Sequence, residues 1–201
     1  MWLWRKLQCL TSFYTSTDNP AVSRSENNYF NNYFTLFGLN EGFGLDRSAL
    51  DSQYKALQSQ YHPDKFADAE DSQRLKALQQ TSLVNDAYET LKSPLKRAAY
   101  LLKLNDVDPE EHNQAHFGEA FLIRQMELRE ALETLSASED IDGLEAMKAE
   151  AGKEKDTAVA AFEKQFMAKE FASAKSTYNQ MQFLFKLLDE IDSVEEKILD
   201  Y

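Results

Sequence analysis

Between two segments of helical periodicity lies the stretch Tyr61-His62-Pro63-Asp64-Lys65-Phe66. Pro63 has a fixed φ and no amide hydrogen, and its ring keeps His62 out of the α-helical conformation. A helix is therefore expected to end just before His62. Because an imidazole, a rigid ring and a carboxylate make a poor core element, we expect His62-Pro63-Asp64 to form an exposed loop that serves in recognition.

The apolar residues around this loop follow the spacing of helix faces. Leu50, Tyr54, Leu57 and Tyr61 are four, three and four residues apart, which places them on one side of a helix. Asp46 can cap the start of that helix. Further helix signals are Gly38 at the end of a short first helix, Leu75, Leu78, Val84, Ala87, Tyr88 and Leu91 in a third, and Ser93-Pro94 at the start of a fourth that continues through Leu104.

The second half of the chain predicts a bundle. Three long periodic segments occupy residues 116–136, 139–168 and 170–199. The short connections between them favour antiparallel neighbours, so the sequence predicts an all-α chain that ends in an antiparallel three-helix bundle. The expected divisions are a leader at 1–28, a first helical domain at 29–104, a turn-rich linker at 105–115 and the bundle at 116–201.

Composition limits the classes of function. Only 6 Gly and 4 Pro occur in 201 residues, as is typical of helical proteins. No apolar run approaches the ~18 residues that span a bilayer, so we expect a soluble chain without membrane association. Cys9 is the single cysteine, which excludes an internal disulfide and a thiolate-rich zinc site and favours a reducing compartment.

Charge is divided unevenly along the chain. Residues 1–104 contain 12 Lys/Arg and 11 Asp/Glu, whereas residues 105–201 contain 10 and 23. This asymmetry suggests two modules with different partners, although a solvated acidic surface that only aids solubility is the simpler alternative. The acidic half would repel a phosphate backbone, so nucleic-acid binding is not expected.

Residues 1–28 differ from the rest of the chain. They are rich in Trp, Ser, Thr and Asn, and no acidic residue precedes Asp18. An organelle transit segment, an upstream translation start and a disordered tail all fit this composition.

A short helix, an amphipathic helix, a His-Pro-Asp loop and a second amphipathic helix together resemble a J-domain. From about residue 30 to the C-terminus, the chain resembles the HscB family of J-domain co-chaperones in iron–sulfur cluster assembly. The motifs that carry this resemblance are Tyr33-Phe34-Thr35-Leu36-Phe37-Gly38-Leu39, Gln60-Tyr61-His62-Pro63-Asp64-Lys65-Phe66, Ser93-Pro94-Leu95, Ala99-Tyr100-Leu101-Leu102 and Leu128-Arg129-Glu130.

The resemblance implies a function as an adaptor. A member of this family binds an Hsp70-type (HscA-like) ATPase chaperone through its J-domain and an iron–sulfur scaffold protein (IscU-like) through its bundle. It delivers the scaffold and stimulates ATP hydrolysis by the chaperone. It has no cofactor or metal of its own, is not an enzyme, and is expected to be a monomer.

The chaperone-binding residues expected from the resemblance lie in and before the loop. Asp64 can accept a charge-assisted hydrogen bond from a cation of the partner, and Pro63 holds Asp64 and His62 in a preset geometry. The alternative is that Asp64 only caps the next helix. Unlike J-domains with a basic helix before the loop, this chain offers few cations there. The full set is Arg47, Lys55, His62, Pro63, Asp64 and Lys65.

The helix after the linker has more apolar residues than one core face requires. At about 100° per residue, Leu128 and Leu132 fall near Phe121 on one face, with Leu135. Other apolar residues point elsewhere and indicate a contact surface, which could be internal or could bind a partner. The resemblance assigns scaffold binding to Leu122, Ile123, Met126, Glu127, Glu130 and Phe183.

Three other interpretations stay open at this point. The chain could be a general J-domain co-chaperone for unfolded clients, a structural module that forms oligomers, or an enzyme. An enzyme is the least favoured, because no phosphate loop or catalytic constellation occurs and His112 and His116 lack a third metal ligand. Since related eukaryotic proteins often have an N-terminal Cys-x-x-Cys motif that is missing here, the bacterial cytoplasm is favoured over the mitochondrial matrix.

Overall fold

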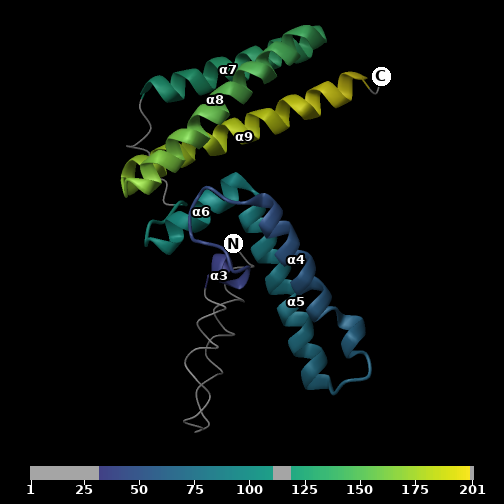
Figure 1. Cartoon of the computed structure of the whole chain (residues 1–201). Coiled ribbons are helices and arrows are strands. Elements are labelled where there is room, and N and C mark those ends of the chain that lie inside the picture. The colour runs from purple at the N-terminus through teal and green to yellow at the C-terminus, as the bar shows by residue number, and fades with distance from the viewer. Residues whose placement is uncertain (1–31, 111–118, 200–201) are drawn as a thin grey trace.

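The computed structural model describes residues 32–110 and 119–199, and every regular element in these ranges is a helix (Figure 1). The predicted all-α fold is therefore confirmed. The leader, His112 and His116 lie outside the described residues. The elements are α3 (Tyr33–Leu36), α4 (Arg47–Tyr61), the 3₁₀ turn η1 (Pro63–Phe66), α5 (Asp71–Lys92), α6 (Pro94–Leu104), α7 (Glu119–Ser138), α8 (Ile141–Met167) and α9 (Phe171–Leu199).

The ends of the first helices follow the signals in the sequence. Asp46 caps α4 by accepting a hydrogen bond from the Ala49 amide at 3.0 Å. Ser93 caps α6 in the same way, and Pro94 occupies the first helical position. Gly38 follows α3 with φ +64°, a conformation that glycine adopts without the usual steric cost.

The second half forms the expected antiparallel arrangement. Asp140 caps α8 through the Gly143 amide at 3.0 Å. Glu139 and Lys169, at the two tight connections, have φ +53° and +59°. The helices α8 and α9 form a long hairpin. Helix α7 lies beside the part of this hairpin that is farther from α4 and α5 (Figure 1).

The two halves share one hydrophobic core. Phe34, Leu50 and Leu91 of the first half belong to the same buried cluster as Phe162 of α8 and Met181 of α9. The first part of the expected linker is folded as well, because Pro109 is buried and Val107 packs against this cluster. A second cluster, around Leu132 and Ile191, lies beneath α7. The two modules expected from the sequence are therefore joined by a continuous hydrophobic core.

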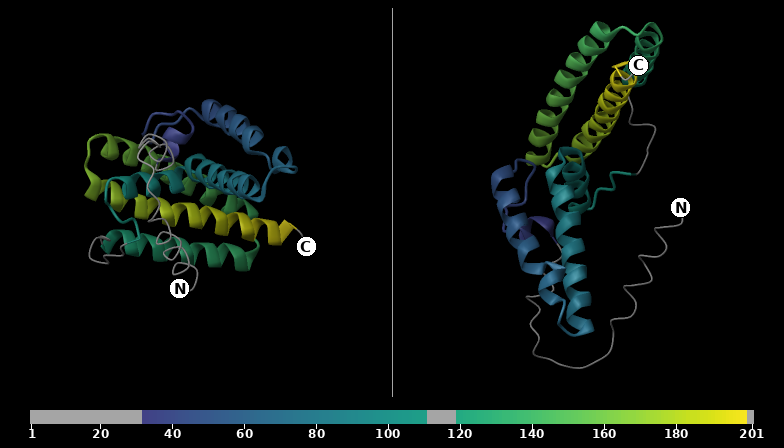
Figure 2. Two further views of the ribbon diagram at one scale, coloured as in Figure 1. Left: turned by 90° about the horizontal axis from the view of Figure 1, so that it is seen from below. Right: turned by 90° about the vertical axis from the view of Figure 1, so that its right-hand side faces the viewer.

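The hairpin of α4 and α5 projects away from the bundle (Figures 1 and 2). Its free end holds η1, whereas α6 and the other end of the hairpin adjoin α8 and α9. The fold thus separates the His-Pro-Asp loop from α7 by most of the length of the molecule.

Candidate functional site

The His-Pro-Asp loop forms the exposed tip of the α4–α5 hairpin. Helix α4 ends at Tyr61, and His62 leaves the helical conformation with φ −55° and ψ 127°, as the following proline requires. Thr81 of α5 donates a hydrogen bond to the Tyr61 carbonyl at 2.9 Å and so fixes the base of the loop. Exposed residues of this tip are His62, Pro63, Asp64 and Lys65.

His62 and Asp64 form a local pair that suits either charge state of the imidazole. The Asp64 amide donates to Nδ1 of His62 at 3.3 Å, and Oδ2 of Asp64 lies 3.5 Å from the same nitrogen. Neutral Nδ1 accepts from the amide, and protonated Nδ1 donates to the carboxylate. The Asp64 side chain is 90% exposed, so its carboxylate stays in solvent whichever of the two contacts His62 makes.

The capping alternative for Asp64 is wrong. The residue that precedes α5 is Glu70, and no side chain caps that helix. Asp64 instead lies in the first turn of η1, where its carboxylate remains available to a partner. The loop is therefore exposed, and its Asp64 side chain does not cap α5.

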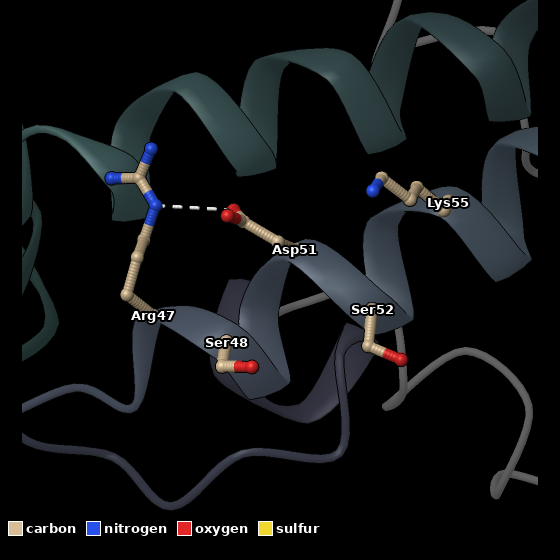
Figure 3. Close-up of a pocket in the computed structure, with 5 residues that line it drawn as sticks. All are labelled: Arg47, Ser48, Asp51, Ser52 and Lys55. Carbon is tan, nitrogen blue, oxygen red and sulfur yellow. Dashed lines mark hydrogen bonds and ion pairs between the residues drawn. The ribbon is translucent and has the colours of Figure 1, made fainter.

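The basic residues of α4 differ in their availability. Nε of Arg47 pairs with Oδ1 of Asp51 at 3.1 Å, as Figure 3 shows, and a second guanidinium nitrogen donates to the Lys92 carbonyl at 3.1 Å. Lys55 lies on the same side of α4 and is exposed (Figure 3). Because Arg47 is already paired, Lys55 and Lys65 are better placed than Arg47 to contact a partner.

Helix α7 has a buried face and an opposite exposed face, as the helical spacing predicts. Leu128 and Leu132 are buried, whereas Leu122, Ile123 and Met126 are 46%, 49% and 72% exposed. We call these three exposed residues the outer face of α7. Glu127 and Glu130 are exposed beside them.

Arg124 attaches this part of α7 to α8. One guanidinium nitrogen lies 2.9 Å from Glu154 and 2.8 Å from Glu150, and the bond to Glu154 does most to raise the pKa of Arg124 above its usual value. These ion pairs hold the helix while its outer face stays open to solvent.

Phe183 occupies a different position from the other residues assigned to scaffold binding. Its ring is half-buried and packs edge-on against Phe121, with ring centroids 6.0 Å apart. The Arg129 guanidinium lies 6.0 Å from the ring centre. Phe183 therefore belongs to the seam between α7 and α9, where it also forms part of the wall of a groove with Phe121 and Leu184.

In residues 32–110 and 119–199, no group of three or more His, Cys, Asp or Glu could hold a metal ion. None of the helices described here is both long and apolar enough to cross a bilayer. The tip and the outer face of α7 remain the two candidate contact surfaces.

The fold and the exposed tip define a J-domain protein, and family models agree. The DnaJ domain matches residues 32–100, and the model described as "HSCB C-terminal oligomerisation domain" matches residues 118–192. A co-chaperone HscB homolog from Vibrio cholerae is 41% identical over 84% of this chain and 99% of its own length. One from Neisseria meningitidis is 37% identical over 80% of this chain and 97% of its own length. The chain belongs to the HscB co-chaperone family.

Solved structures of relatives have the same architecture. HscB from Vibrio cholerae superimposes with a TM-score of 0.77 at 40% identity, covering 83% of this chain and 99% of that one. Human HscB gives a TM-score of 0.75 at 26% identity, covering 88% and 84%. Jac1 from Saccharomyces cerevisiae, at 20% identity with a TM-score of 0.65 over 80% and 94%, shares the fold.

Proposed function

We propose that this co-chaperone binds an iron–sulfur scaffold protein through α7 and presents it to an Hsp70-type chaperone, whose ATP hydrolysis it stimulates through the His-Pro-Asp tip. The chain itself has no catalytic role in this scheme. The proposal rests on one observation: the molecule has an exposed, preset loop at one end and an exposed apolar helix face at the other.

The tip is suited to a charged contact with the chaperone. The Asp64 carboxylate is solvated before binding and can accept a charge-assisted hydrogen bond from an Arg or Lys of the partner. Pro63 and the His62–Asp64 pair restrict the loop before binding, so less ordering entropy is lost when the complex forms. His62 and Asp64 are therefore the residues that we expect stimulation to require most.

The outer face of α7 is suited to reversible binding of the scaffold. Covering the exposed parts of Leu122, Ile123 and Met126 would contribute about 3–5 kcal/mol, whereas association costs roughly 4–15 kcal/mol. The apolar face therefore supports at most a modest affinity and needs polar contacts beside it, as suits reversible delivery. Glu127 and Glu130 at its border favour a partner with complementary basic residues.

The test measures the ATPase rate of the cognate Hsp70-type chaperone with and without scaffold. Wild-type protein should raise the rate, and scaffold should raise it further. His62→Gln and Asp64→Asn should each abolish stimulation while scaffold affinity stays at the wild-type value. Full stimulation by both variants would contradict the role of the tip.

A scaffold titration tests the second surface. Specific, saturable binding of the folded scaffold supports delivery of one dedicated partner. If the protein instead binds many unfolded chains and shows no preference for the scaffold, it is a general J-domain co-chaperone.

We also propose a monomer that acts in the bacterial cytoplasm. The relatives from Vibrio cholerae and Neisseria meningitidis support a bacterial setting. The C-terminal family is described as an oligomerisation domain, so light scattering at working concentration is the direct test of the monomer.

A further inference from the structure

Helix α5 has two large apolar side chains that no other part of the described structure covers. Leu75 and Leu78 are 57% and 54% exposed, although Ala77 and Val84 of the same helix are buried. Both lie in the half of α5 that begins beside the loop. We call Leu75 and Leu78 the tip ridge.

The contacts between α4 and α5 show how far along the hairpin this ridge lies. Arg47 reaches the Lys92 carbonyl, Tyr88 donates to Asp51, and Tyr54 donates to Asn85. Each step forward along α4 thus matches an equal step backward along α5.

Continuing this pairing places Leu78 opposite Tyr61, the last residue of α4. The bond from Thr81 to the Tyr61 carbonyl, at 2.9 Å, agrees with that placement. Leu75 lies almost one turn further, about 4.5 Å along the axis, beside the loop itself. Helix α5 also contacts η1 directly.

The same contacts show which face of the hairpin the ridge occupies. Leu78 precedes Asn85 by seven residues and Lys92 by fourteen, so the three lie in one row along α5. Asn85 and Lys92 contact Tyr54 and Arg47 of α4. Leu78 therefore faces the side of the hairpin that carries Arg47, Asp51 and Lys55, and Leu75, about 60° further round α5, borders that side.

Electrostatic attraction on this side is weak. Arg47 is paired with Asp51, and Arg74 beside the ridge is paired with Asp71 at 2.8 Å. Of the expected cations, Lys55 and Lys65 remain exposed to attract an acidic partner, and two exposed leucines adjoin the loop that the partner must contact. A protein surface that covers His62 and Asp64 from this side would also cover the ridge.

We propose that Leu75 and Leu78 are an apolar anchor for the Hsp70-type chaperone, which covers them when it engages the His-Pro-Asp tip. This inference rests on the proposed function and extends the chaperone surface from the loop onto α5. Apolar contact supplies affinity here that a basic face on α4 would otherwise supply. The partner surface is apolar and adjoins the cation that meets Asp64.

The experiment uses the full chain and measures the co-chaperone concentration that gives half-maximal stimulation of the chaperone ATPase. Leu75→Ser with Leu78→Ser should raise that concentration about 10- to 30-fold, because each leucine loses the gain from burying its exposed half. The rate at saturation should approach the wild-type rate, since His62 and Asp64 are intact. Scaffold affinity should not change.

Two controls separate local from general effects. Met167→Ser with Leu199→Ser removes apolar side chains of 76% and 72% exposure from the bundle and should leave the half-maximal concentration unchanged. Leu75→Met with Leu78→Met keeps the apolar surface and should restore wild-type behaviour. If the serine double variant melts early, Leu75→Ser alone is measured in the same way.

The outcomes are distinct. If His62→Gln abolishes stimulation but the serine double variant acts at the wild-type concentration, the ridge proposal is overturned and the proposed function stands. If wild-type protein does not stimulate the chaperone, the proposed function fails and the ridge proposal fails with it. If the wild type self-associates in sedimentation and the double variant does not, the ridge is a contact between copies and the proposal is again overturned.

Salt gives an independent readout. An apolar anchor predicts that the ratio of the half-maximal concentrations of the serine double variant and the wild type changes little as salt rises from about 0.01 to 0.15 M, where the screening length falls from about 30 to 8 Å. Salt weakens the Asp64 contact in both proteins alike. A ratio that falls to one as salt rises would show that the substitutions act through charge, contrary to the proposal.

Discussion

Phe43, in the loop before α4, packs against Phe162 of α8 with ring centroids 4.9 Å apart. The Arg97 guanidinium of α6 lies 4.9 Å from the centre of the Phe43 ring and donates to the Leu91 carbonyl at 2.6 Å. Burial lowers the pKa of Arg97. The contact joins the J-domain to α8, on which α7 also packs, so the tip and the outer face of α7 are connected through the same helix.

Phe162→Ala should destabilise both halves together. Its side chain is fully buried in the shared core, and truncation of such a residue typically costs about 3–5 kcal/mol. We expect one urea unfolding transition, seen at the same midpoint by circular dichroism and by a fluorescent label on the α4–α5 hairpin. Met167→Ala, at an exposed position of the same helix, should change stability by only about 0.5 kcal/mol. Two separate transitions in the wild-type protein would show that the halves unfold independently.

The helices and their ends could be predicted because their signals are local. Neighbouring residues alone determine three of these signals: the apolar spacing of α4, the caps Asp46 and Ser93, and the helix break at Pro63. The shared core could not be found in this way, since Phe43 lies in a loop with no periodicity and meets Phe162 across the fold.

The two candidate surfaces illustrate the same limit. Helical angles correctly placed Leu122 and Met126 on an exposed face, because one helix fixes that geometry. They could not show that Phe183 packs against Phe121, which depends on how α7 meets α9. Leu75 follows helical spacing yet is exposed, because α4 ends at Tyr61 and no longer covers α5 at that level.

Two glycine-to-alanine changes should have opposite effects on stability. Gly38→Ala should destabilise the fold by about 1–2 kcal/mol, since φ is +64° and an L-residue resists that conformation. Gly152→Ala lies within α8, where a Cβ would meet nothing within 4 Å, and should stabilise the fold by about 0.5–1 kcal/mol. Urea denaturation compares both variants with the wild type. Equal effects of the two changes would show that backbone conformation at Gly38 is not the cause.

Stability should fall at alkaline pH because of buried tyrosines. Burial raises the pKa of Tyr178 above 10.0, its ordinary value. In the unfolded chain the phenol ionises near that pH, whereas the fold favours the neutral form. Stability from this group is therefore fully present below about pH 10 and is lost as pH rises through the folded pKa.

Tyr178→Phe isolates this contribution. At neutral pH the variant should lose roughly 0.5–1.5 kcal/mol, because the Tyr178 hydroxyl accepts a bond from Gln182 at 2.9 Å. Above pH 10 the difference from wild type should narrow, as only the wild-type residue can ionise on unfolding. Urea midpoints measured across the alkaline range check this, and a constant difference would contradict it.

Phe183 and the outer face of α7 should respond differently to truncation. Leu122→Ala with Met126→Ala removes exposed side chains, so scaffold affinity should fall about 10-fold or more while the unfolding free energy changes by about 0.5 kcal/mol per site. Phe183→Ala removes a half-buried ring packed against Phe121 and Arg129. It should lower stability and, by loosening α7 against α9, reduce scaffold affinity as well. Phe183→Leu, which keeps most of the apolar volume, should recover much of both. If Phe183→Ala weakens scaffold binding without any loss of stability, the ring acts as a direct contact and its packing in the seam is incidental.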